Sequence, residues 1–296
     1  MRANPAIAFA VATAGIAVFA SMDAVMKAQS LLIGAYSAML WRTVFGVALS
    51  GAAFAVTRPR WPSRIEIKLH VARGAAAGVS VVLFFWGLTR VPMAQGVALT
   101  FIAPLIALFL AAVVLRERVG RTAVIASLIA FAGVLVILLG QARAEMGPDA
   151  FRGALAILAA AVLYAVNLIL LRRQALAARP IEIAFFTNVV FLGVYAIGAP
   201  FLLVWPAPGQ WPWLAFAAVL ATVSILALAW AYARAEASYL APVEYTAFIW
   251  ASILGWLVFG ERVQPLTVLG AALIVIGCVI AARRSPPPAP SVEAAM

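Results

Sequence analysis

A charged side chain lies deep inside one of the long apolar stretches of this 296-residue chain. Arg42 stands about ten residues into the stretch 33–56. A charge at bilayer depth costs about 3 kcal/mol or more and usually marks a function or a buried pair. Because a guanidinium keeps its proton, Arg42 must find an anion or several carbonyl groups. It could clamp a carboxylate or phosphate bidentately, and the alternative is a structural pair with Glu244 or with helix-end carbonyls.

Glu244 is an acidic group in a second apolar stretch, 239–259, two residues after Pro242. Carboxylates held away from water serve in proton coupling or in contacts with amino groups. The alternative is a carboxylate at the membrane edge that reaches water, or one that pairs with Arg42 or Arg234. The two groups together favour a small zwitterion or anion as the bound molecule.

Four further polar residues in apolar stretches have structural readings that compete with functional ones. Asp23 and Lys27 are spaced i, i+4, which favours an intrahelical ion pair, with an outer gate as the alternative. Asn167 and Asn188 carry amides that usually bridge neighbouring helices, worth on the order of 1 kcal/mol. Gating for Asn167 and binding of a small molecule for Asn188 remain the alternatives.

Aromatic residues divide into those that flank the apolar stretches and those within them. Trp61, Trp205, Trp211 and Trp213 flank stretches and are typical of an interfacial belt. Aromatic residues within the stretches could line a partly apolar pocket, although contact with the core or with lipid is their more frequent role. These residues are Trp86, Trp230, Tyr164, Tyr245, Phe248 and Trp250.

The elements that must position these residues are apolar helices. The chain is 66% hydrophobic and 10% charged, with a mean hydropathy of +1.09, whereas soluble domains have roughly 25% charged residues. Stretches of about 20 apolar residues predict membrane-spanning helices. We predict ten spans, at 5–27, 33–56, 68–89, 92–115, 121–140, 152–172, 182–204, 211–233, 239–259 and 265–283. The fold class is therefore all-α, a polytopic membrane bundle.

A repeat with an offset of 144 residues divides the chain. Glu117-Arg118-Val119 recurs as Glu261-Arg262-Val263, and Thr100 is the counterpart of Glu244. The same offset joins Trp86 with Trp230, Arg90 with Arg234, Leu110 with Leu254, Val114 with Val258, and Gly133 with Gly277. We predict a first repeat at 1–142, a second at 150–284, and a proline-rich, disordered tail at 285–296. Because five spans are an odd number, the second repeat must insert upside down, a common plan of secondary transporters.

The loop charges predict the orientation. Lys and Arg residues are far more numerous in the segments that share a side with the amino terminus than in those opposite, which favours cytoplasmic placement of both termini. Trp86 and Trp230 would then lie near opposite membrane faces and could close a cavity alternately.

Several function classes find no support in the residues. The net charge of +11 comes from short loops, so nucleic acid is not expected as a partner. The chain has one His and one Cys, and it has no metal-ligand cluster, no phosphate-binding loop and no nucleophile placed beside a base. We therefore expect no enzyme, no metal and no cofactor. Cys278 is interpreted as a packing residue.

The chain resembles the EamA-type branch of the bacterial drug/metabolite transporter superfamily over about residues 5–283. The resemblance rests on Phe84-Phe85-Trp86-Gly87-Leu88-Thr89-Arg90-Val91-Pro92, on Pro104, and on the Glu-Arg pairs at 117–118 and 261–262. It implies a multi-pass protein of the bacterial inner membrane, with a central cavity that opens to one side at a time. Members mostly export amino acids and other small metabolites, and some import riboflavin.

These observations predict a secondary or facilitative carrier that works by alternating access. The expected substrate is an amino acid, with export favoured. Arg42 would hold the carboxylate, and Glu244 would bind the amino group or carry a proton. Trp86, Trp230, Tyr245 and Trp250 would shape and gate the pocket. The alternatives are a carrier of an aromatic metabolite such as riboflavin, and multidrug efflux. Besides the substrate, the expected partners are the lipid bilayer and a proton as candidate coupling ion. A monomer is sufficient, and a homodimer is left open.

Overall fold

The computed structural model describes residues 5–57, 61–103, 105–107, 109–110, 121–143, 147–175, 180–232, 234, 240 and 243–282. Within these residues the secondary structure is helical. The elements are α1 (Pro5–Ile33), α2 (Ala35–Thr57), α3 (Arg64–Leu88), α4 (Met93–Thr100), α6 (Arg121–Arg143), α7 (Gly147–Ala175), α8 (Pro180–Leu202), the short 3₁₀ turn η1 (Pro208–Gln210), α9 (Trp211–Tyr232), α11 (Thr246–Phe259) and α12 (Pro265–Ala282).

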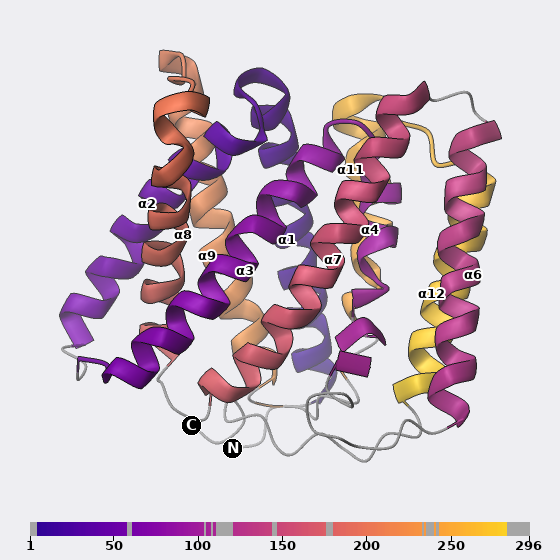
Figure 1. The fold of residues 1–296 in the computed structure, drawn as a ribbon, viewed down its shortest axis with the longest axis horizontal. Coiled ribbons are helices and arrows are strands. Elements are labelled where there is room, and N and C mark those ends of the chain that lie inside the picture. Colours follow the sequence, from indigo (N-terminus) through magenta and orange to yellow (C-terminus); the bar gives the residue numbers. More distant parts are fainter. Residues whose placement is uncertain are drawn as a thin grey trace.

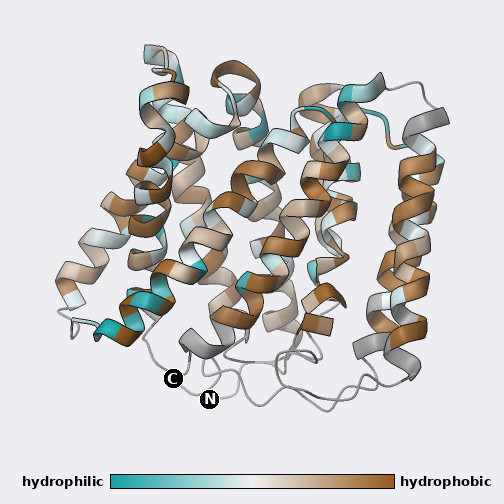
Figure 2. Ribbon diagram, in the orientation of Figure 1, coloured by the Kyte–Doolittle hydropathy of each residue, from teal (hydrophilic) through white to brown (hydrophobic). Residues whose placement is uncertain are grey.

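Six of these helices, α1, α2, α3, α7, α8 and α9, are long and apolar enough to cross a membrane by length and composition. Shorter apolar segments lie in α4, α6, α11 and α12. Apolar residues follow the helices over most of their lengths, and the hydrophilic ones gather mainly toward the helix ends (Figure 2). The chain is a polytopic, multi-pass membrane protein, whereas the count of ten spans and the side of the termini stay predictions.

Several helix boundaries differ from the predicted spans, and two of them are the most informative. The first helix runs to Ile33, six residues beyond the predicted end, and stops at Gly34, whose φ of +78° is a left-handed conformation typical of a residue that ends a helix. The helix α11 begins at Thr246, although the predicted span begins at 239. Pro104, Glu117-Arg118, Pro242 and the tail at 285–296 lie outside the described residues.

The helices pack in pairs with a two-fold pattern. The most extensive contacts join α1 to α9, α3 to α7, α2 to α8 and α6 to α12. A shift of 144 residues carries α1 onto α7 and α3 onto α9, so it exchanges the first two pairs, while each of the other two pairs maps onto itself. The pair of α6 and α12 stands at one side of the bundle, and α2 and α8 stand at the other (Figure 1).

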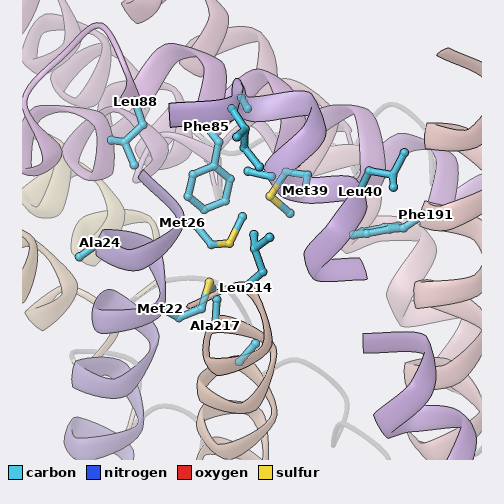
Figure 3. Close-up of a cluster of buried hydrophobic side chains, with 14 of the residues drawn as sticks. Met22, Ala24, Met26, Met39, Leu40, Phe85, Leu88, Phe191, Leu214 and Ala217 are labelled. Carbon is cyan, nitrogen blue, oxygen red and sulfur yellow. The ribbon is translucent and has the colours of Figure 1, made fainter. Parts of the chain in front are cut away.

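The largest apolar core joins the first helices to α9. Met22 and Met26 of α1, Met39 of α2, Phe85 of α3 and Leu214 of α9 are among its buried members (Figure 3). The unbranched thioether side chains fill the irregular gaps between tilted helices. This core ties α1, α2 and α3 together, so the charged groups on these helices are held in fixed positions.

The two ends of the bundle are named here from Figure 1. The lower end holds the start of α1 and the end of α12, and the upper end holds the turn from α3 to α4 and the loop from α11 to α12. The helices α1, α3 and α8 run from the lower to the upper end, and α2, α7, α9 and α12 run the opposite way.

Candidate functional site

The inner face of α8 carries polar groups at two heights. Thr187, Phe191 and Tyr195 follow one another at four-residue spacing, which places them on one face of a helix. Phe191 and Tyr195 are buried in the main core. An arginine from another helix lies near each end of this stripe. The half-buried Arg42 interacts with Tyr195, and the buried Arg73 contacts Thr187.

Arg42 lies in the upper half of α2, seven residues after the helix starts at Ala35. Its guanidinium interacts electrostatically with Tyr195 and Asp23, and Asp23 is a buried carboxylate of α1. The Nε atom of Arg42 is buried and has no hydrogen-bond partner among the described residues. Because buried guanidinium donors need acceptors, Arg42 has capacity left for an oxygen of a bound molecule.

Asn188 bridges α2 and α8 below Arg42, as expected for an amide in a membrane helix. Its Nδ2 atom donates to Ser50 Oγ at 3.3 Å and to the Ala184 carbonyl at 3.1 Å. Gly46 allows this approach, since a Cβ there would lie 2.6 Å from Asn188 Oδ1. The described bonds of Asn188 are thus structural, and its role in binding a small molecule stays a prediction.

The lower cluster is centred on Arg73 of α3, which lies inside the predicted span 68–89. Its Nη1 atom donates to Asn167 Oδ1 at 3.2 Å, and Nη2 donates to Thr187 Oγ1. Its Nε atom is buried without a hydrogen-bond partner among the described residues. The Tyr164 hydroxyl interacts electrostatically with Arg73 and with Glu244. The structure therefore brings Tyr164 and Asn167, two predicted site residues, close to an arginine, and Glu244 interacts electrostatically with Tyr164.

Glu244 differs from the buried carboxylate considered from the sequence. Its side chain is exposed, and it lies two residues before the start of α11. The structure thus agrees with the alternative of a carboxylate that reaches the outside of the protein. Arg42 has its described electrostatic partners elsewhere, at Tyr195 and Asp23.

The predicted ion pair between Asp23 and Lys27 is wrong. Lys27 Nζ instead pairs with Glu261 Oε1 and donates to the Val91 carbonyl at 2.9 Å. The reason is that α1 continues to Ile33, which brings Lys27 level with the α3–α4 turn and the α11–α12 loop. Glu261 Oε2 also accepts the Met93 N–H at 2.7 Å, at the start of α4. A carboxylate is favourable at the positive end of a helix.

Trp86 and Trp230 have equivalent surroundings at opposite ends of the bundle. The guanidinium of Arg90 lies 3.5 Å from the ring centre of Trp86, and that of Arg234 lies 4.1 Å from the ring centre of Trp230. Each arginine also donates to the carbonyl of its tryptophan. These four residues are the repeat pairs identified in the sequence. Their cation–π contacts lie at the carboxyl-terminal ends of α3 and α9.

The other predicted pocket residues lie apart from both arginines in the described contacts. Trp230 and Trp250 pack against a small cluster of α1, α9 and α11. Tyr245 packs edge-on against Phe101 with ring centres 5.4 Å apart. Thr100 donates to the Val97 carbonyl at 2.7 Å. Their roles in binding and gating remain predictions.

A buried pair that the sequence did not reveal joins α3 and α8 near the lower end. His70 Nε2 lies 3.1 Å from Glu182 Oε1, and the imidazole stacks on Phe186 with ring centres 4.8 Å apart. His70 and Glu182 are 112 residues apart in sequence, so no local spacing could have indicated the pair. In the part of the chain that the structure describes, no group of three His, Cys, Asp or Glu side chains could hold a metal ion.

Comparison with known proteins gives consistent matches along the chain. The family model described as the EamA-like transporter family matches residues 6–139 and again residues 151–283. The chain is 32% identical over 215 residues to a riboflavin transporter of Vibrio cholerae, covering 70% of this chain and 68% of that protein.

Two further comparisons cover more of the chain. It is 31% identical over 266 residues to a probable terminal-alkyne amino-acid exporter of Streptantibioticus cattleyicolor, covering 82% of each protein. A crystal structure with 22% sequence identity covers 95% of this chain and 100% of its own chain with a TM-score of 0.61, which shows a shared fold.

Proposed function

The chain belongs to the EamA-like transporter family, and on this premise we propose that it is a secondary or facilitative carrier of a small amino-acid-type substrate. Membership in a transporter family is the reason to expect transport and no enzymatic activity. The substrate crosses a bacterial inner membrane, and export is the favoured direction. The amino-acid exporter among the relatives supports this substrate class.

Transport proceeds by alternating access between two inverted five-span repeats, residues 1–142 and 150–284. The two-fold pattern of helix contacts supports this arrangement, and so do the two separate family matches. The lower end faces the cytoplasm, together with both termini. A proton is the candidate coupling ion, and a monomer suffices for the cycle.

The Lys27–Glu261 pair serves as the gate of the upper end. Lys27 and the Val91–Met93 segment belong to the first repeat, whereas Glu261 belongs to the second. The bonds that Glu261 makes to both parts hold the two repeats together at this end. Opening toward the outside requires that the loop between α11 and α12 moves away from α1.

The observation that carries the substrate proposal is the half-buried Arg42, whose buried Nε atom has no hydrogen-bond partner among the described residues. A carboxylate offers two acceptor oxygens in the geometry that a guanidinium donates to. The buried carboxyl group of Asp23 interacts electrostatically with Arg42, and a substrate carboxylate can take its place as the partner of the guanidinium. Glu244 binds the amino group or carries the proton.

Counterflow in liposomes tests the proposal. The purified chain is reconstituted, and the uptake of labelled neutral amino acids, aromatic amino acids and riboflavin is measured against a gradient of the unlabelled compound. We expect uptake of an amino acid that falls at least about tenfold in Arg42→Ala. Unchanged uptake of a carboxylate substrate by Arg42→Ala would rule out the clamp.

Riboflavin is the second candidate, favoured by the Vibrio cholerae relative. It is a flat aromatic molecule, and the tryptophans at 86, 230 and 250 would contribute more to its binding than Glu244. Uptake of riboflavin alone in the same experiment replaces the amino-acid proposal. Uptake of unrelated cationic drugs in competition with both would favour multidrug efflux.

A further inference from the structure

Arg73 is a buried cation whose described hydrogen-bond partners are all neutral. The residue is 6% exposed. Its two bonds go to an amide oxygen of Asn167 on α7 and a hydroxyl oxygen of Thr187 on α8. The Thr187 hydroxyl donates a hydrogen bond to the Ile183 carbonyl at 2.5 Å, so it acts as the acceptor toward Arg73. A charge taken out of water is expected to have an anionic partner, and among the described residues Arg73 hydrogen-bonds with none.

The guanidinium of Arg73 is held in place, but not all of its hydrogen-bond donors have an acceptor among the described residues. Asn167 and Thr187 fix its two Nη atoms from two helices, and the buried Nε atom has no hydrogen-bond partner among the described residues. A rigid, pre-oriented donor loses little entropy when an acceptor arrives. This arrangement resembles that of Arg42, whose Nε atom is also buried and unpartnered.

Exposed residues connect this guanidinium to the outside of the bundle. The Tyr164 hydroxyl interacts electrostatically both with Arg73 and with Glu244. Tyr164 is 47% exposed, and the Glu244 side chain is exposed as well. The hydroxyl of Tyr164 thus interacts with a cation and with a carboxylate, the two kinds of group that a zwitterion requires of its site.

The two arginines lie at different heights of the bundle. On α8, Thr187 lies near Arg73 and Tyr195 lies near Arg42. These two residues are eight positions apart, or about 12 Å along the helix axis. Arg42 lies in the upper half of α2 and Arg73 in the lower half of α3. A carboxylate could occupy one and then the other as it crosses.

We propose that Arg73 is a second carboxylate-binding arginine, which with Tyr164 and Glu244 forms a lower subsite for the zwitterionic substrate. This inference takes its substrate class from the proposed function. It assigns the substrate a binding site that is separate from Arg42. Asn167 and Thr187 are positioning residues that hold the guanidinium. The amino group of the substrate faces Glu244, which, like Arg73, interacts with the Tyr164 hydroxyl.

Ligand-induced thermal stabilisation of the full chain in detergent tests the subsite without requiring transport. A ligand that binds the folded protein stabilises it by RT ln(1 + L/Kd) at a free ligand concentration L, so its Tm rises with ligand concentration. The probes are leucine and phenylalanine, their amides, which lack the carboxylate, and sodium chloride. The variants are Arg73→Gln, Arg73→Lys and Arg42→Gln, with Arg152→Gln as control, since Arg152 forms an exposed pair with Asp149.

We expect the amino acids to raise the Tm of the unmodified chain and the amides and chloride to have no effect. Arg73→Gln should raise the apparent Kd of the amino acids about tenfold or more. Arg73→Lys should raise it less, because lysine keeps the positive charge but cannot donate bidentately as a guanidinium does. Arg152→Gln should respond like the unmodified chain. Because each variant is compared with itself in the absence of ligand, a change in its basal Tm does not obscure the response.

Four results would overturn the subsite. A lower basal Tm of Arg73→Gln with an unchanged ligand response means that Arg73 only tethers α3, α7 and α8. Loss of the response in Arg42→Gln alone places the carboxylate at Arg42 and leaves the proposed function standing. An equal response to chloride means that the guanidinium binds any small anion. No response of the unmodified chain to either amino acid also contradicts the subsite, whereas the proposed function is decided separately by counterflow.

Discussion

Three buried ionisable side chains among the described residues contact partners far away in the sequence. Lys27 pairs with Glu261, Arg73 donates to Asn167 and Thr187, and His70 contacts Glu182. The partners come from different helices, so each contact holds two or more spans in register. Removing one partner leaves the other charged and desolvated, which costs more than the loss of the contact itself.

The Lys27–Glu261 pair gives an asymmetric prediction. The Lys27 side chain is 4% exposed and that of Glu261 is 19% exposed. After Glu261→Ala, Lys27 stays buried without its anion, and we expect a loss of stability of about 3–5 kcal/mol. Lys27→Met leaves the partly exposed Glu261, which can be rehydrated, so its cost should be smaller. Thermal unfolding followed by size-exclusion chromatography measures both.

The double variant Lys27→Met with Glu261→Ala provides the control for this pair. It should be more stable than Glu261→Ala alone, since no unpaired charge remains. Additive losses in the double variant would contradict a direct coupling between the two side chains.

At the scale of elements, close helix crossings depend on glycine. A Cβ on Gly133 of α6 would lie 2.6 Å from the Gly270 carbonyl of α12. A Cβ on Gly87 of α3 would lie 2.5 Å from the Gly153 carbonyl of α7. In both places the obstacle is backbone, which cannot rotate away, so these residues set the distance between paired helices.

We expect Gly133→Ala to separate α6 from α12 and to lower the stability by about 1–3 kcal/mol, the usual cost of overpacking. Gly193→Ala in α8 is the matched control, because no atom lies within 4 Å of its added Cβ. The control should be neutral or stabilising by up to about 1 kcal/mol, since alanine favours the helix. Thermal stability of the two purified variants decides the comparison, and equal effects would contradict the packing argument.

At the scale of the whole molecule, the two-fold pairing of helices organises both arginine sites. The helices α2 and α8 form a pair that maps onto itself, and α8 contacts the two arginines at different heights. The neighbours of each arginine differ, since Asp23 interacts with Arg42 and the corresponding Asn167 bonds to Arg73. The equivalent positions 23 and 167 thus carry different side chains, an acid in the first repeat and an amide in the second.

Cysteine labelling in intact cells tests the orientation of the molecule. In a Cys278→Ser background, Gly209→Cys places a thiol in η1 at the upper end, and Arg64→Cys places one at the start of α3 at the lower end. Both positions are exposed. A membrane-impermeant maleimide should label Gly209→Cys in intact cells and Arg64→Cys only after the cells are opened. The reverse pattern would contradict cytoplasmic termini.

The sequence by itself determined what depends on composition and local spacing. Long apolar stretches predicted α1, α2, α3, α7, α8 and α9 as membrane-length helices, because a bilayer requires helices of about 20 apolar residues. The motif residues of the family carried enough information to predict the family, which the match over both halves confirmed. The repeat also placed Trp86–Arg90 and Trp230–Arg234 in equivalent positions, and the structure gives both pairs the same contact.

Only the tertiary structure decided which charges meet. The spacing of Asp23 and Lys27 favoured a local pair, but a residue 234 positions away binds Lys27 instead. Arg73 looked like one more basic residue until α7 and α8 supplied its neutral acceptors. The physical reason is that side-chain pairing in a bundle depends on the rotation and height of each helix, which contacts between distant segments set and local periodicity does not contain.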